Sequence, residues 1–297
     1  MIKPKSNQHP FFSIIIPSLN EETALPRLLE DLTQQTNQKF EVIHVDGQSE
    51  DNTCKLAQKF ASKLPSFKQN ISPIRHVSHQ RNLGAKVATG TYLLFLDADS
   101  QIPPYFLEGI SYQIHRQPVD LFTTWLKADS DRTADKAIVT SINLSLDISN
   151  SLDAPFALGT IIGASPKAFK KIGGFREDVK FAEDEDFIRT GHKLNLSFAI
   201  YRHPRLIMDL RRFRHEGSLT TLQQIATKRL SIITSKSHQI LKPRDYAMGG
   251  HVFRDNSAGK TAFIRLDNVI RQFARRPKLK QTLKDLITFQ ELEDPNQ

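Results

Sequence analysis

Cysteine and tryptophan are nearly absent from this sequence, each occurring once among 297 residues. The single cysteine, Cys54, cannot form an internal disulfide and has no second thiol with which to share a metal. This excludes a disulfide-stapled secreted domain and a cysteine-based zinc site, and it fits a reducing compartment.

Long apolar runs are also missing. No run approaches the roughly 18 residues that a membrane-spanning helix requires. The start, Met1-Ile2-Lys3-Pro4-Lys5, lacks the apolar segment of a secretory signal peptide. We therefore expect a cytoplasmic protein. The 39% of hydrophobic residues are enough to fill the core of one large α/β domain with an appendage.

The net charge of +9 is concentrated in the last third of the chain. Residues 1–210 contain 24 Lys and Arg against 24 Asp and Glu, whereas residues 211–297 contain 17 against 8. Such a basic region can bind anionic lipid, nucleic acid or a phosphorylated acceptor. We expect no nucleic acid as partner, and we keep peripheral contact with the inner face of the membrane as a hypothesis. A basic helix packed on the domain is the preferred interpretation.

Short apolar runs alternate with amphipathic stretches over the first 130 residues. This pattern predicts a doubly wound α/β sheet. The run 91–96 (TYLLFL) is typical of a strand buried on both faces at the centre of a parallel sheet. Strands are predicted at 11–17, 40–45, 74–77, 91–96, 119–126, 160–164, 197–201 and 205–210, and helices at 21–35, 51–63, 78–89, 103–115, 132–149, 166–172 and 183–194.

Two domains are predicted on this basis. Residues 1–217 form the α/β domain, and residues 218–297 form a basic, mainly helical C-terminal extension. The extension is expected to contain helices at 220–241 and 261–288.

Polar residues follow three of the predicted strands at the point where each ends. They lie in 17–22 (PSLNEE), 46–49 (DGQS) and 97–99 (DAD). In an open parallel sheet, ligands bind outside the carboxyl ends of the strands. Each segment alone also fits a local role, such as a helix cap or a tight turn.

The pair Asp97 and Asp99 indicates more than a turn. In an extended backbone, residues two apart point the same way, so both carboxylates can face one point beyond the strand. Two carboxylates that close repel unless a cation lies between them. Mn²⁺ or Mg²⁺ suits oxygen ligands and keeps waters and substrate phosphates as further ligands, so the pair predicts a divalent cation as cofactor.

Several motifs in order resemble the family 2 glycosyltransferases, which have the GT-A fold. They are 11–22 (FFSIIIPSLNEE), 42–53 (VIHVDGQSEDNT), 81–84 (RNLG), 93–100 (LLFLDADS) and 163–191, which contains the acidic segment EDED. The resemblance covers about residues 11–195. It implies a GT-A, Rossmann-like, mostly parallel sheet flanked by helices, and a nucleotide-sugar donor.

The resemblance also implies roles for individual residues. The implied donor-binding residues are Pro17, Leu19, Glu21, Asp46, Arg81, Asp97 and Ala98, with Asp46 at the base and Arg81 near the nucleotide. Asp99 would ligate the metal beside the diphosphate, and Asp184 would be the catalytic base. Because the acidic run leaves the register open, Glu183 and Asp186 remain candidates for the base.

The family commonly has a second acid where this chain has Gly47 and Gln48, which leaves the donor nucleotide open. Processive members of the family carry a Gln/Arg-x-x-Arg-Trp motif, which is missing here because the one tryptophan, Trp125, precedes the acidic segment. Together with the missing membrane spans, this favours a non-processive transfer. The resemblance implies inversion at the anomeric carbon, and we expect a saccharide or lipid-linked acceptor.

Two other functions are considered. A sugar nucleotidyltransferase would require a glycine-rich, basic phosphate-binding loop after the first strand. Residues 17–22 (PSLNEE) are neither glycine-rich nor basic. A non-enzymatic anionic-lipid or nucleic-acid-binding protein would use the basic C-terminal region.

The remaining candidates come from histidine and arginine. His44, on an apolar strand, is interpreted as a core histidine. His203, His215 and His251 are candidates for the metal or diphosphate site. The run 211–214 (RRFR) is either a contact to the diphosphate or acceptor, or a solvated loop.

Overall fold

The computed structural model describes residues 9–179 and 182–216. Three central strands are buried along their whole length. β1 (Phe12–Ser18) pairs in parallel with β2 (Phe40–Asp46) on one side and with β4 (Tyr92–Leu96) on the other. β3 (Phe67–Ile71) lies at the edge, parallel to β2. The prediction of a central strand at 91–96 is confirmed.

The other half of the sheet contains the single reversed strand of the described residues. β6 (Ile161–Ala164) runs antiparallel to both β4 and β5 (Leu121–Ala128), and β7 (Phe198–Met208) pairs in parallel with β5. The strand order is β3-β2-β1-β4-β6-β5-β7. The predicted mostly parallel α/β sheet is confirmed.

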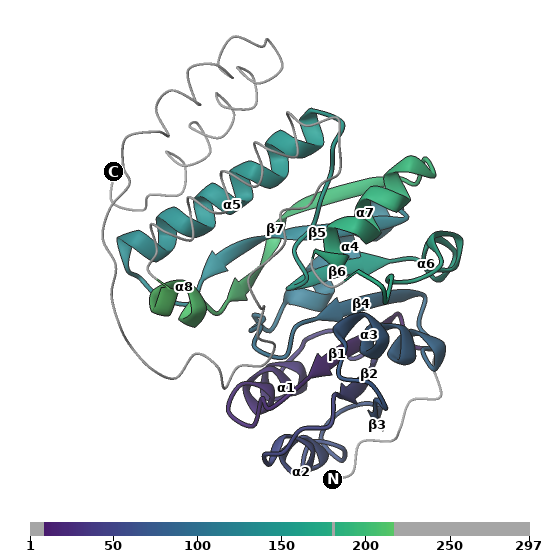
Figure 1. Ribbon diagram of the computed structural model, residues 1–297, viewed down its shortest axis with the longest axis vertical. Coiled ribbons are helices and arrows are strands. Elements are labelled where there is room, and N and C mark those ends of the chain that lie inside the picture. Colours follow the sequence, from purple (N-terminus) through teal and green to yellow (C-terminus); the bar gives the residue numbers. More distant parts are fainter. Residues whose placement is uncertain (1–8, 180–181, 217–297) are drawn as a thin grey trace.

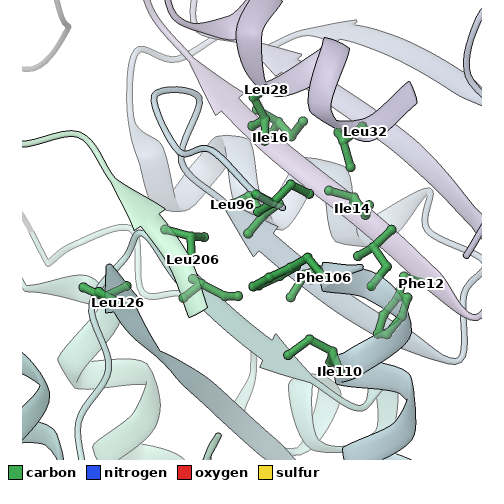
Figure 2. Packing of buried hydrophobic residues seen from close by; sticks show 14 of the residues in the cluster. Phe12, Ile14, Ile16, Leu28, Leu32, Leu96, Phe106, Ile110, Leu126 and Leu206 are labelled. Atoms are coloured by element: carbon green, nitrogen blue, oxygen red, sulfur yellow. The ribbon is translucent and has the colours of Figure 1, made fainter. Parts of the chain in front are cut away.

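Helices cover both faces of this sheet (Figure 1). Side chains of α1, α2, α4 and α5 share one core cluster, and those of α3, α6 and α7 pack in the other. Figure 2 shows Leu28 and Leu32 of α1 packed against Ile16 and Ile14 of β1. The described helices are α1 (Leu25–Thr33), α2 (Thr53–Gln58), α3 (Val77–Lys86), α4 (Phe106–Arg116), α5 (Thr133–Ser151), α6 (Pro166–Ile172), α7 (Glu183–Lys193) and α8 (Arg211–Glu216).

The third strand was predicted in the wrong place. We predicted it at 74–77, but β3 occupies Phe67–Ile71, and Val77 begins α3. The sequence FKQNI carries little apolar character because the strand is at the edge, with its residues partly exposed. Apolar content therefore misplaced this strand, since it reports burial more than extended backbone.

The last strand also differs from the prediction. β7 is one strand rather than two, and it continues through the His203–Pro204 peptide, with its register to β5 shifted between Thr124 and Leu126. At the shift, the Asn143 side chain bonds both the N–H and the carbonyl of Leu126, at 2.8 and 2.9 Å. A side chain thus replaces part of the strand ladder.

The segment after β7 is the short helix α8, where we had weighed a solvated loop. The predicted extension 218–297, with its helices at 220–241 and 261–288, lies outside the described residues. Within the described ranges, none of the helices has the length and apolar character needed to cross a bilayer.

Candidate active site

The carboxyl ends of β1 and β2 meet at Ser18 and Asp46, which are register partners. The Asp46 carboxylate is buried and accepts hydrogen bonds from the Ser49 N–H at 2.8 Å, the Ser49 hydroxyl at 2.6 Å and the Ser18 hydroxyl at 3.3 Å. Its present contacts order the loop that follows β2.

His44 of β2 contacts Ser18 at the end of β1. Its Nε2 lies 2.7 Å from the Ser18 hydroxyl, and the side chain is fully buried. Burial lowers the pKa of His44 to about 4, although Asp46 opposes this shift. The ring is therefore neutral near pH 7, which agrees with its interpretation as a core histidine.

Of the predicted pocket residues, Pro17 is buried in β1, whereas Leu19 and Glu21 are partly exposed just beyond it. Gln80 of α3 donates to the carbonyls of Ser18 and Val45, at 2.8 and 2.9 Å. The helix therefore pins the ends of both strands.

Asp97 and Asp99 lie in a turn and not in the extended backbone that we had assumed. The Ser100 N–H donates to the Asp97 carbonyl at 3.1 Å, which closes the turn around Ala98. The carboxylates nevertheless stay accessible, since the side chains of Asp97 and Asp99 are 35% and 42% exposed. The turn presents both carboxylates beyond the carboxyl end of the central strand β4.

Negative charge is concentrated around Asp99. Partial burial, followed by the carboxylates of Asp97, Glu21 and Asp209, raises the pKa of Asp99 to about 7, and Arg211 opposes the shift. The Arg211 Nη2 lies 3.9 Å from Asp99 Oδ2. This environment disfavours an unpaired carboxylate and favours a bound cation.

The donor set fits a cation shared with a substrate. In residues 9–179 and 182–216, no group of three or more His, Cys, Asp or Glu side chains is arranged to hold a metal ion. The carboxylates of Asp97 and Asp99 are oxygen ligands of the kind that Mg²⁺ and Mn²⁺ take together with phosphate oxygens and waters. His203 lies in β7, where its carbonyl accepts from Gln113 of α4. The His215 side chain and His251 lie outside the described part.

Arg81 joins the Asp97 turn to α7. Its side chain is 2% exposed, and it donates from Nη1 to Glu183 Oε1 at 2.8 Å and from Nη2 to Asp97 Oδ1 at 3.0 Å. Nη2 also lies 3.3 Å from the Gly159 carbonyl, and the guanidinium stacks 5.1 Å from the Phe175 ring. Burial opposes the charge of Arg81, but Asp97 and Glu183 outweigh it and raise the pKa of Arg81.

Asp184 differs in its contacts from two of the acids beside it. Glu183 is paired with Arg81, and Asp186 is buried and paired with Arg189 at 2.7 Å. Asp184 instead accepts backbone N–H groups, from Gly159 to Oδ2 at 2.6 Å and from Glu185 to Oδ1 at 2.8 Å.

The protonation of Asp184 follows from this environment. Burial, followed by the charges of Glu183 and Glu185, raises the pKa of Asp184 to about 7, and Arg81 opposes the shift. A carboxylate with a pKa near neutrality is suited to accept a proton at physiological pH.

Two residues of this site were not predicted from the sequence. A Cβ built at Gly159 would lie 2.7 Å from Arg81 Nη2 and 3.5 Å from Asp184 Oδ2, so a side chain at this position would require the Arg81 guanidinium to shift. Asp209, just past β7, is buried beneath Arg211, with its side chain 3% exposed. Neither belongs to a recognisable motif, although the acid before a run of arginines was a signal that we did not use.

Comparisons with known proteins identify the family and the fold. The model of glycosyl transferase family 2 matches residues 13–173. A glycosyltransferase of Haemophilus influenzae is 29% identical over 182 residues, which are 59% of this chain and 60% of that protein. The chain thus spans less than two thirds of that relative.

Two solved structures have a similar fold. The mannosyltransferase PcManGT of Pyrobaculum calidifontis, in complex with GDP-Man and Mn²⁺, matches 80% of this chain and 68% of its own, with a TM-score of 0.58 and 20% identity. TarS 1–349 of S. aureus, in complex with UDP-GlcNAc, matches 67% of this chain and 58% of its own, with a TM-score of 0.55 and 23% identity.

The mostly parallel sheet, with acidic groups beyond the ends of its strands, has an α/β fold of the GT-A type. The chain belongs to glycosyl transferase family 2, as the match over more than half of its length shows.

Proposed function

We propose that this protein transfers one sugar from a nucleoside diphosphate sugar to an acceptor hydroxyl, with inversion at the anomeric carbon and with a divalent cation. The observation that carries the proposal is the pairing of Arg81 with both Asp97 and Glu183. This pairing brings the acidic turn after β4 beside the Asp184 carboxylate of α7. This proximity supports a diphosphate site at the turn and a base at Asp184, side by side at the carboxyl ends of the strands.

The solved relatives support the class of donor. PcManGT was crystallised with GDP-Man and Mn²⁺, and TarS with UDP-GlcNAc, so the same fold holds nucleotide sugars in both. Pro17, Leu19, Glu21, Asp46 and Ala98 are proposed to line the donor site together with Asp97. Gln48 leaves the choice between uridine and guanosine open, because its side chain bonds the carbonyls of residues 72 and 73 instead of pointing to a base.

The proposed chemistry divides between the two acidic sites. Asp99, with Asp97, would hold the cation, which would supply positive charge against the charge that develops on the leaving diphosphate. Asp184 accepts the proton of the acceptor hydroxyl as its oxygen bonds to the anomeric carbon and the bond to the diphosphate breaks. Attack from the face opposite the leaving group inverts that carbon.

The acceptor and the location stay predictions. A saccharide or lipid-linked acceptor, transfer without processivity and a cytoplasmic setting are predicted from the sequence. The peripheral membrane contact rests on basic residues that lie outside the described part. The 1–217 and 218–297 division is likewise a proposal. Family membership favours the transferase over the nucleotidyltransferase and the non-enzymatic alternatives.

Calorimetric titration tests the donor site. UDP, GDP and TDP are titrated into wild type with and without Mn²⁺, and then into Asp99→Asn. Asp131→Asn is the matched control, because the Asp131 side chain is fully exposed. We expect one nucleotide to bind with Mn²⁺, and its affinity to fall at least about tenfold in Asp99→Asn alone. Absence of binding under every condition would overturn the proposal.

A further inference from the structure

The end of β7 is held beside the turn that carries Asp97 and Asp99. Gln101 and Ile207 exchange two backbone hydrogen bonds, at 3.0 and 2.9 Å, in an isolated antiparallel bridge. Gln101 follows the acidic turn by two residues, and Ile207 precedes Asp209 by two. The bridge therefore fixes Asp209 and Arg211 next to Asp99.

Asp209 holds Arg211 in place. Its buried carboxylate accepts from the Arg211 Nε at 2.6 Å and from the Arg211 N–H at 2.8 Å, and it also pairs with Arg27 at 3.5 Å. These contacts engage the backbone and Nε of Arg211. Its Nη2 points to Asp99, 3.9 Å from Oδ2, and the side chain is 38% exposed. Because the side chain is partly exposed, the guanidinium has space to tilt as a whole away from Asp99 while it remains beside Asp209.

Arg211 and a divalent cation would compete for the same carboxylate. Both are positive, and repulsion between like charges a few ångströms apart is strong at a partly buried site. A cation on Asp99 therefore displaces the end of the guanidinium from that oxygen. The diphosphate that shares the cation would then offer the displaced end a new negative partner, and arginine pairs well with phosphate oxygens.

We propose that Arg211 is a charge placeholder, which neutralises Asp99 while the donor site is empty and contacts the donor diphosphate once a divalent cation has bound. Asp209 is the positioning residue that keeps Arg211 within reach of both groups. This inference rests on the proposed function, because it assumes that a nucleoside diphosphate binds at this edge.

Replacement of Arg211 has opposite effects on the two ligands. In Arg211→Gln, Mn²⁺ alone binds about threefold more tightly, because its competitor at Asp99 is gone. UDP or GDP in saturating Mn²⁺ binds about tenfold more weakly, because a charge-assisted hydrogen bond to the diphosphate is lost. A purely structural role for Arg211 would weaken both.

The experiment measures free Mn²⁺ by electron paramagnetic resonance in the absence of nucleotide, and UDP and GDP binding by calorimetry at saturating Mn²⁺. Arg27→Gln is the matched control, since Arg27 pairs with the same Asp209 and its loss changes the net charge equally. Arg211→Lys keeps the charge, and we expect it to retain most of the competition. Circular dichroism melts establish that each variant is folded.

Tighter Mn²⁺ binding together with weaker nucleotide binding in Arg211→Gln, absent from Arg27→Gln, supports the placeholder. Unchanged or weaker Mn²⁺ binding in Arg211→Gln overturns it, and so does an equal gain in Arg27→Gln. Failure of the proposed function is distinguishable, because wild type would then bind no nucleotide, while the Mn²⁺ measurement still tests the competition at Asp99.

Discussion

Arg81 Nη1 donates to Glu183 Oε1 at 2.8 Å, which joins α3 to the first turn of α7 across 102 residues of sequence. The same guanidinium reaches Asp97 at 3.0 Å. The buried guanidinium of Arg81 therefore sets the distance between the proposed donor site and helix α7.

Arg81→Lys should break this arrangement although it keeps the charge. An ammonium cannot bond both carboxylates in the geometry of the guanidinium fork. We expect a loss of about 3 kcal/mol in the free energy of unfolding, at the low end for a broken buried pair because Asp97 is 35% exposed. Urea unfolding measures it. Arg75→Lys, at an exposed pair with Glu50, is the control and should lose less than about 1 kcal/mol. Equal losses would contradict the role of Arg81.

Gly159→Ala tests the packing between the arginine and the proposed base. The new Cβ would lie 2.7 Å from Arg81 Nη2, so the guanidinium must shift away from Asp97 and Glu183. We expect a loss of about 1–3 kcal/mol in stability and a clear fall in kcat. Denaturant melts and sugar-transfer assays measure these effects. Wild-type values for both would mean that the loop yields without disturbing Arg81.

Asp184→Asn should separate chemistry from binding. If Asp184 is the base, kcat falls about 10²- to 10⁴-fold, while the affinity for the nucleotide changes little. Glu183→Gln and Asp186→Asn are the comparisons, because both side chains are paired with arginine. A larger loss of kcat in either of them, with Asp184→Asn still active, would move the role of base to that residue.

The pH dependence of transfer follows from the raised pKa of Asp184. A base with a pKa of about 7 is protonated and inactive below that pH, so kcat should rise with pH and level off above 7. Glu185→Gln removes one of the charges that raise this pKa, and the rising limb should move about half a pH unit lower. Steady-state profiles of both proteins measure the shift. A limb that moves to higher pH would argue against Asp184.

His44 should make the fold sensitive to acid. Burial lowers the pKa of His44 to about 4 in the folded protein, whereas an unfolded histidine titrates near 6.5. Between these values the unfolded chain binds the extra proton, so stability is lost as the pH falls from about 6.5 to 4, by up to about 3 kcal/mol. His44→Gln should flatten this slope in urea melts at several pH values. The control His115→Gln, on the exposed face of α4, should keep it.

Local patterns in the sequence were enough to predict most of the fold. Short apolar runs placed β1, β2 and β4, because strands buried on both faces are mostly apolar. The edge strand β3 escaped detection because partial exposure removes that requirement. The acidic residues after the strands were also visible, since their types and order form recognisable motifs.

The relations between those acids were decided by tertiary structure. Neither the pairing of Arg81 with Glu183 nor the place of Gly159 beside Asp184 leaves a periodic signal in the sequence, because each depends on packing between distant segments. The same holds for Arg211 and Asp99, which the bridge between Gln101 and Ile207 brings together. Local sequence sets which groups are available, and long-range packing sets their distances, on which electrostatic interactions depend.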